Sequence, residues 1–491
     1  MKRIFVIIVL IFLVIVVKAQ IPETEYMPIT INSCTEVFHA EVEVTAGESD
    51  TIPIPQNNYR RIYFVHGLGG DASSLEQMSN AFVDNSLNIL GFPARKCLTS
   101  RPEYSNSTGS LVSGANTVRE YVRDRAEDDI VQYAMNPDDA FLIGHSQGGM
   151  VLRTMAHLDL VTDTLPMPSF GKGYNGMVTL GAPLQGGKIL NNRNLIINMS
   201  DYACRCLIEG PTSSFWVNLI LKKTIGREYG NSVSAVLSSK LLPVVFGDYF
   251  DGITNYYKVG APWIDSLNSD VSNLKYMKMP KVAFYAVEPQ SHIFWRTSNW
   301  LVNDPNDEEA FEANDDWAFY NDIFGTVYAK YYAKYEKVIS KKKKIAWKNG
   351  VDWFNTVDPQ WQVVIGARQY HMAYRCKCPR NAIGRPKDYV LKWSATDCIN
   401  GHCDNLSPVV WYEVNSTVKE NDGIVLAESA ANLPGYTGGP VRVYYNEYNY
   451  QARNRGTSHM QMRNDGGIKE KLYNLSEGDY GYFFKTGRKQ M

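Results

Sequence analysis

The sequence predicts an α/β fold with a mostly parallel central sheet and helices on both of its faces. Short apolar segments alternate with segments of helical period, and several of the apolar segments run into glycine-rich turns. This alternation is typical of a doubly wound parallel sheet. The chain has 491 residues, more than one hydrophobic core usually holds, so we also expect two large cap insertions in the core.

The first elements of this sheet are expected between residues 60 and 135. The apolar segment 60–65 breaks at residues 66–70, which read His-Gly-Leu-Gly-Gly, and this pattern predicts a strand followed by a tight loop. Residues 113–135 carry apolar side chains on one helical face and charged side chains on the other. We therefore expect a helix there, stopped by the Asn136-Pro137 pair.

The most informative motif lies at residues 144–149, which read Gly-His-Ser-Gln-Gly-Gly. It follows the apolar segment 140–143 and precedes a helical pattern over about 148–160, so Ser146 is expected where a buried strand turns sharply into a helix. A G-x-S-x-G sequence in this context predicts a nucleophile elbow. A serine hydroxyl is a weak nucleophile at neutral pH, so it needs a base and hydrogen-bond donors for the oxyanion that forms.

Further core strands are expected at 177–180, 281–287, 409–412 and 441–445. In an open parallel sheet, ligands bind outside the carboxyl ends of the strands. Ser146 and the loop after Val65 both fall at that edge. The sequence therefore predicts a reactive site there.

A serine nucleophile needs a histidine to carry its proton, and eight histidines are available. His459 is the strongest candidate, because it lies in a loop after the expected strand 441–445, whereas most of the others fall inside motifs, helices or the cysteine-rich segment. His292, directly after the strand 281–287, is a less favoured alternative.

The histidine in turn needs a carboxylate that fixes its tautomer. Asp422 lies in a polar loop after the expected strand 409–412, and Glu288, at the end of the strand 281–287, is the competing acid. An Asn-Asp-Gly sequence alone is more often a simple turn. The order Ser146, Asp422, His459 favours Asp422, because it is the order that α/β-hydrolases use.

The chain begins with two basic residues, fourteen apolar residues at 4–17 and small residues before position 20. This pattern predicts a secretory signal peptide cleaved near Ala19, since fourteen apolar residues are fewer than the roughly 20 of a spanning helix. Cleavage would leave 47 basic and 51 acidic residues, a balance that does not favour a nucleic-acid partner. We expect a small or neutral partner molecule and a secreted, periplasmic or cell-surface location.

The eight cysteines form an even set in a chain expected to enter an oxidising compartment. Disulfides are therefore the favoured interpretation. The cluster of Cys376, Cys378, Cys398 and Cys403, with two histidines nearby, leaves zinc as an alternative, although Cys-x-Cys is not the usual zinc spacing.

The first expected insertion, residues 188–255, contains apolar pieces that favour a lid over a hydrophobic pocket. The second insertion, 289–407, is aromatic and charged and contains half of the cysteines. Within it, the lysines at 330, 334, 337, 341, 344 and 348 would line one face of a helix. A solvated face is the favoured interpretation, and contact with an anionic lipid surface is the alternative.

Five motifs together resemble secreted lipases and esterases of the α/β-hydrolase superfamily, especially bacterial triacylglycerol lipases. They lie at residues 66–70, 144–149, 179–187, 421–425 and 458–459. The resemblance covers about 60–190, 256–288 and 408–470, but not the insertions or the N-terminal segment. It implies that the backbone amides of Leu68 and Gln147 form the oxyanion hole. No carboxylate pair matches the structural calcium site of such lipases, so we expect no metal and no cofactor.

The sequence as a whole predicts a secreted carboxylic ester hydrolase that acts on a lipid or another ester. An acyltransferase with the same acyl-enzyme is one alternative, and a non-catalytic binding protein on a hydrolase scaffold is another. The expected divisions are a signal peptide at 1–19, an N-terminal extension at 20–59, core segments at 60–187, 256–288 and 408–491, and insertions at 188–255 and 289–407.

Overall fold

The fold is described from a computed structural model. The described residues are 36–37, 59–84, 94–106, 109–135, 140–161, 173–174, 176–204, 252–269, 279, 281–288, 294, 326–337, 339, 341–377, 389–392, 404–410, 412–413, 415–433, 441–443, 458–463, 465, 468–469 and 472. The signal peptide expected at 1–19, nearly all of the N-terminal extension, the middle of the first insertion and much of the second lie outside the described residues.

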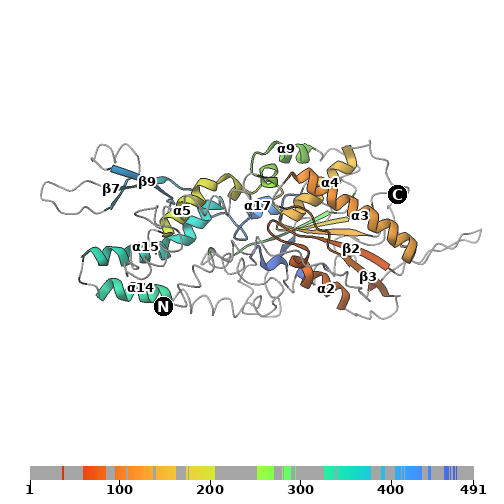
Figure 1. Cartoon of the computed structure of the whole chain (residues 1–491), viewed down its shortest axis with the longest axis horizontal. Coiled ribbons are helices and arrows are strands. Elements are labelled where there is room, and N and C mark those ends of the chain that lie inside the picture. The colour runs from red at the N-terminus through yellow and green to blue at the C-terminus, as the bar shows by residue number, and fades with distance from the viewer. Residues whose placement is uncertain are drawn as a thin grey trace, which may run out of the picture.

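A seven-stranded sheet forms the centre of the described core (Figure 1). Its strands are β1 (Glu36–Val37), β2 (Tyr59–Val65), β3 (Ala94–Ser100), β4 (Phe141–His145), β5 (Gly176–Leu180), β6 (Lys281–Ala286) and β10 (Val441–Val443). Their order across the sheet is β1-β3-β2-β4-β5-β6-β10, and every neighbouring pair is parallel except β1 and β3. The prediction of a mostly parallel sheet is confirmed.

Helices cover both faces of this sheet, as predicted. One face packs on α3 (Leu111–Tyr133), α4 (Gln147–Val161) and α9 (Pro262–Ser269), and the other packs on α2 (Glu76–Asp84) and on the side chains of Met462, Ile468 and Leu472. The alternation of side chains along β2 explains the two layers. Tyr63 and Val65 face the first layer, whereas Ile62 and Phe64 face the second. A strand buried on both faces needs such an unbroken apolar run.

The long helix α3 begins and ends within two residues of the predicted bounds. Ser110 is its N-cap, and its side chain accepts a hydrogen bond from the Ser113 amide at 3.0 Å. At the other end, Ala134 adopts a left-handed conformation with φ of 51°. The helix therefore ends before the Asn136-Pro137 pair that was expected to stop it.

The two insertions meet in one apolar cluster on the side of the molecule away from the sheet (Figure 1). The helix α5 (Arg193–Cys204) belongs to the first insertion, and α15 (Lys341–Val364) belongs to the second. Leu195 and Met199 of α5 are buried against Trp353 and Val364 of α15. The described parts of the insertions thus share a common core.

Two predictions differ from the structure, one in the core segment expected at 408–491 and one in the second insertion. The strand expected at 409–412 is the end of β9 (Asp404–Val410), which lies in a separate antiparallel sheet with β7 (Met372–Lys377) and β8 (Tyr389–Lys392). A short apolar run fits either sheet, so periodicity alone did not distinguish them. The lysine-rich segment forms two helices, α14 (Thr326–Lys337) and α15, that pack on each other, not the single helix expected.

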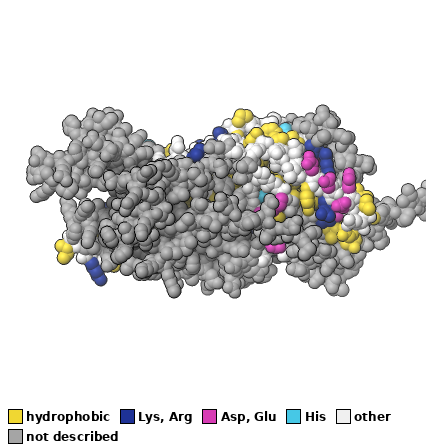
Figure 2. All heavy atoms as spheres, viewed as in Figure 1, with side chains coloured by type: hydrophobic (Ala, Val, Ile, Leu, Met, Phe, Trp, Pro, Cys, Tyr) yellow, Lys and Arg dark blue, Asp and Glu magenta, His cyan; other side chains and the backbone are white. Residues whose placement is uncertain are grey.

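Basic and acidic side chains lie beside each other over the end of the core that carries α3 (Figure 2). Arg125 and Asp128 form one such pair on this helix, 3.6 Å apart.

Among the described helices, none combines the length and apolar character of a membrane span. Cys97, buried on β3, is disulfide-bonded. Cys34, Cys206, Cys378, Cys398 and Cys403 lie outside the described residues, so the other disulfides and the zinc alternative stay untested.

A buried ion pair joins β2 to α3. The Arg61 guanidinium donates to both carboxylate oxygens of Asp129, through Nε at 2.7 Å and through a second nitrogen, and it also donates to the Ser100 hydroxyl at 3.1 Å. The two side chains are only 7% and 1% exposed. A charge this deeply buried is tolerated because its partner and hydrogen bonds compensate for the lost water.

We predict that Asp129→Ala lowers the free energy of unfolding by about 3–5 kcal/mol, because it leaves the Arg61 charge buried without its partner. Urea unfolding followed by circular dichroism measures the change. The matched control is Glu428→Ala, which breaks the exposed pair between Lys419 and Glu428 and should cost under about 1 kcal/mol. Similar losses of unfolding free energy in the two variants would show that burial does not determine how much the Arg61–Asp129 pair contributes to stability.

Candidate active site

The residues predicted to react lie at the carboxyl edge of the sheet. Ser146 follows β4 directly and has φ of 54°, one of two described non-glycine residues in the left-handed region. Its amide donates to the Leu180 carbonyl at 2.9 Å, which ties the turn to the neighbouring strand β5. A nucleophile elbow is expected to have a strained residue between a strand and a helix, and here a hydrogen bond holds that residue in place.

Close backbone contact explains the glycine that follows the elbow. A Cβ atom on Gly148 would lie 2.2 Å from the Val65 carbonyl oxygen and 2.5 Å from that of His66. The first turn of α4 therefore lies directly on the end of β2, where only a glycine fits. This contact places Ser146 beside the loop 66–70, and a Cβ atom on Gly67 would lie 2.9 Å from the Ser146 Cβ.

Asp422 and His459 are in direct contact although 37 residues separate them. The Asp422 Oδ2 atom lies 2.7 Å from the His459 Nδ1 atom, and both side chains are buried. The other carboxylate oxygen, Oδ1, accepts from the amides of Ile424 at 3.0 Å and Val425 at 2.7 Å. One oxygen is thus fixed by the loop and the other is directed at the imidazole. The His459 amide also donates to the Asp422 carbonyl at 2.7 Å.

Gly181 brings this pair next to the elbow. It directly follows Leu180, whose carbonyl binds the Ser146 amide, and it has φ of 58°. A Cβ atom on Gly181 would lie 3.1 Å from Asp422 Oδ2 and 3.2 Å from His459 Nδ1. Side chains larger than glycine would therefore press on the acid and the histidine.

The competing acid, Glu288, lies behind the Asp422 loop. It is buried, and its amide donates to the Asn421 carbonyl at 2.7 Å. The carboxylate in direct contact with His459 is that of Asp422. The competing histidine, His292, lies outside the described residues.

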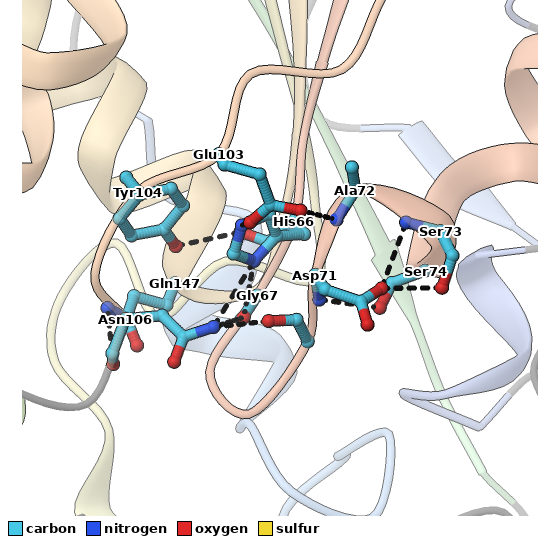
Figure 3. Close-up of polar contacts among 11 residues, drawn as sticks. His66, Gly67, Asp71, Ala72, Ser73, Ser74, Glu103, Tyr104, Asn106 and Gln147 are labelled. Atoms are coloured by element: carbon cyan, nitrogen blue, oxygen red, sulfur yellow. Dashed lines mark hydrogen bonds and ion pairs between the residues drawn. The ribbon is translucent and has the colours of Figure 1, made fainter. Parts of the chain in front are cut away.

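The two amides predicted to bind an oxyanion flank Ser146. Gln147 is the first residue of α4, where an amide has no acceptor within its own helix, and the partial positive charge of the helix N-terminus adds to it. Leu68 follows Gly67 in the loop after β2. The Gly67 carbonyl accepts from the Gly70 amide at 3.1 Å and contacts the His66 Nδ1 atom at 3.1 Å (Figure 3). Because a trans peptide is planar, these contacts also fix the direction of the Leu68 N–H.

Several contacts within the site were not predicted from the sequence. His145 contacts the carbonyl of His459 with its Nε2 atom at 2.9 Å, and the two rings lie 4.8 Å apart. Glu103, Tyr104 and Asn106 contact the loop 66–72 across more than 30 residues of chain (Figure 3). Spacing and periodicity describe local structure only, so contacts of this kind were not predicted.

The imidazole of His145 is neutral. Burial lowers the pKa of His145 well below its usual value of 6.5, and the neighbouring His459 and Arg463 lower it further. A neutral ring that donates from Nε2 to the His459 carbonyl carries its lone pair on Nδ1. His145 therefore supports the backbone of His459 and stays uncharged.

No family model matches the sequence, and no curated protein is significantly similar to it. Solved structures similar to this chain include a lipase from Bacillus licheniformis in its mature form, with 12% identity over 50% of this chain and 75% of that chain and a TM-score of 0.29. Phospholipase PlaB from Legionella pneumophila has 13% identity over 53% of this chain and 42% of that one, with a TM-score of 0.26. An extracellular α/β-hydrolase from a Paenibacillus species has 15% identity over 46% and 76%, with a TM-score of 0.20.

We predict that Gly148→Ala lowers the free energy of unfolding by about 3 kcal/mol, because its methyl group would overlap the carbonyls of Val65 and His66. Chemical unfolding measures the loss. The control is Gly187→Ala, where the nearest atom to the new Cβ would be 3.5 Å away and φ is an ordinary −93°. Equal stability of the two variants would contradict the close contact at the elbow.

A second prediction concerns pH. Unfolded His145 binds a proton below about pH 6.5, whereas the buried ring does not, so the unfolded state gains protons and the native protein loses stability as the pH falls. Relative to His145→Gln, the wild type should lose up to about 1.4 kcal/mol of unfolding free energy per pH unit below pH 6.5. Urea unfolding at pH 7.5, 6.0 and 5.0 measures both proteins. Parallel pH curves would contradict a neutral, buried His145.

Proposed function

We propose that this chain, whose core has the α/β-hydrolase fold, is a serine carboxylic ester hydrolase. The observation that carries the proposal is the 2.7 Å hydrogen bond between buried Asp422 and His459, at the same sheet edge as the strained Ser146. A nucleophile elbow, an oriented imidazole and two amides at the elbow are the parts that acyl transfer requires.

In the proposed mechanism, Ser146 Oγ attacks the ester carbonyl carbon while His459 Nε2 takes the hydroxyl proton. The carbonyl oxygen becomes an oxyanion that accepts hydrogen bonds from the amides of Leu68 and Gln147. Two such donors can supply several kcal/mol of transition-state stabilisation, on the order of 3 kcal/mol each. Asp422 holds Nδ1–H and stabilises the positive charge that develops on the ring.

The tetrahedral intermediate then collapses, the bond to the alkoxy group breaks, and His459 gives its proton to the leaving alcohol. Water, deprotonated by His459, attacks the acyl-enzyme, and the second intermediate releases the carboxylic acid and restores Ser146. The neutral state of His145 keeps a second positive charge away from the imidazolium that forms next to it.

The proposed substrate is a lipid or another ester with an apolar acyl group. Support comes from the cap, where α5 and α15 bring a buried apolar cluster beside the core. The indole of Trp361 on α15 donates to the Gly423 carbonyl at 2.7 Å, so the cap also reaches the loop of the proposed acid. Secretion after cleavage near Ala19 is part of the proposal, and it depends on the N-terminal sequence alone.

We predict that Ser146→Ala lowers kcat/KM for p-nitrophenyl butyrate by at least about 10⁴-fold, because no other group replaces the nucleophile. The same variant should fail to react with a fluorophosphonate probe, as measured by mass spectrometry. Ser269→Ala, which removes an exposed serine from α9, is the control. It should keep both the kcat/KM for the ester and the reaction with the probe. Full labelling of the Ser146→Ala variant would refute the assignment of the nucleophile.

The acid is tested by a second pair of variants. Asp422→Asn should lower kcat by about 10³–10⁴-fold, because the amide no longer holds the productive tautomer of His459. Glu288→Gln, a change of the rival carboxylate to its amide, should retain kcat within about threefold after correction for folded protein. The opposite result would assign the acid to Glu288 and leave Ser146 as the nucleophile.

A further inference from the structure

The loop that carries Leu68 is rich in glycine. Three of its residues, Gly67, Gly69 and Gly70, are glycines, which lose the most backbone freedom on folding. The second donor, Gln147, lies on a helix that packs into the core. Oxyanion donors are effective only when they are positioned in advance. Some interaction must therefore hold the loop relative to α4.

The segment after β3 supplies this interaction (Figure 3). The Glu103 carboxylate lies 3.1 Å from His66 Nε2 through one oxygen and accepts from the Ala72 amide through the other. The Tyr104 hydroxyl donates to the His66 carbonyl at 2.8 Å, and its ring stacks on the His66 ring at 4.5 Å. Burial raises the pKa of Tyr104, so its hydroxyl remains a donor. These contacts hold the two ends of the loop.

Asn106 contacts the middle of the loop. Its side-chain amide donates to the Gly70 carbonyl and lies 3.5 Å from the Gly67 carbonyl oxygen and 3.4 Å from His66 Nδ1. Gly67 contributes the carbonyl half of the peptide whose N–H belongs to Leu68. The position of Asn106 therefore bears on the direction of the first oxyanion donor.

The same residue is also tied to the second donor. The Gln147 side chain donates from Nε2 to the Asn106 carbonyl at 3.1 Å, and its Oε1 accepts from the Tyr257 hydroxyl at 3.0 Å. Gln147 and Tyr257 are both buried. A continuous chain of hydrogen bonds therefore runs from Tyr257 through Gln147 and Asn106 to the glycine loop.

We propose that Asn106 is a positioning residue that couples the two oxyanion amides, because it links the Gln147 side chain to the carbonyls of the loop that carries Leu68. The inference rests on the proposed ester hydrolase function. Asn106 contacts no reacting atom and acts by fixing the distance between two groups that do. A displacement on the order of 1 Å at such a position can cost about 100-fold in rate.

The test uses the full-length protein with Asn106→Ala and Asn106→Asp, the second of which keeps the size of the side chain but removes its donors. Active sites are counted from the endpoint of fluorophosphonate labelling, and kcat and KM are measured per labelled site with p-nitrophenyl butyrate. Both variants should lose about 10–100-fold in kcat, with KM within about threefold. The inhibition constant of a trifluoromethyl ketone, which forms a tetrahedral oxyanion adduct with the serine, should rise by the same factor.

The matched control is Asn191→Ala. Asn191 also ties a loop together, with its side chain bonded to the carbonyl and the amide of Val259, and it lies in the 3-10 helix η4 (Lys188–Asn191). It should leave kcat per labelled site unchanged.

Gln147→Glu tests the link from its other end and remains informative should both Asn106 variants fail to fold. It keeps an acceptor for Tyr257 and removes the donor to Asn106, so we expect a loss of about 3–10-fold in kcat. If Asn106→Ala is folded, its combination with Gln147→Glu should lose no more than Asn106→Ala alone, since both changes break one chain of bonds.

Unchanged kcat per labelled site in the folded Asn106 or Gln147 variants would overturn the inference, as would fully additive losses. Loss of labelled sites alone, with normal kcat for the remainder, would also overturn it, because that result indicates a purely structural role. An inactive and unlabelled wild type would instead refute the proposed function. The two failures are therefore distinguishable.

Discussion

The contact between the first turn of α4 and the end of β2 is the constraint on which the proposed site depends. Gly148 lies against the carbonyls of Val65 and His66 so closely that no side chain fits between them. This contact sets where the elbow can turn, and Ser146 accepts a left-handed backbone as a result. It also brings the loop after β2 beside the serine. The positions of the proposed nucleophile and of one proposed oxyanion donor thus follow from a single packing contact between a helix and a strand.

The cap is connected to the edge of the sheet that carries the proposed site. Asp422 lies 134 residues after Glu288, and most of that distance is the second insertion. Residues 365–368 follow α15. The amide of Lys419, which lies just before Asp422, donates to the Ala367 carbonyl in this segment at 2.8 Å. Together with the bond from Trp361 to Gly423, this contact fixes the loop of the acid from the cap side. A long excursion between β6 and the acid is therefore compatible with a well-placed carboxylate.

Local pattern and chain order predicted the core well. The alternation of apolar and helical segments predicted the parallel sheet. The glycines around Ser146 predicted a sharp turn between a strand and a helix. The contact of Asp422 with His459 agrees with their predicted pairing, although their catalytic roles remain proposals. The strand before Asp422 was placed in the wrong sheet, because a short apolar run does not specify its partner. Asn106 and the shared cluster of the two insertions depend on contacts across long stretches of chain, which periodicity does not encode.

The Asn106 side chain has a further chemical property. The sequence Asn106-Ser107-Thr108 is an acceptor for N-linked glycosylation, and the nitrogen that would carry the sugar is the one that donates to the Gly70 carbonyl. A sugar would replace one of its two hydrogens and would need space on the side where the glycine loop lies. In a host that attaches such glycans, modification of this asparagine competes with assembly of the loop. The choice of expression host then becomes a determinant of the fraction of molecules in which this loop is assembled.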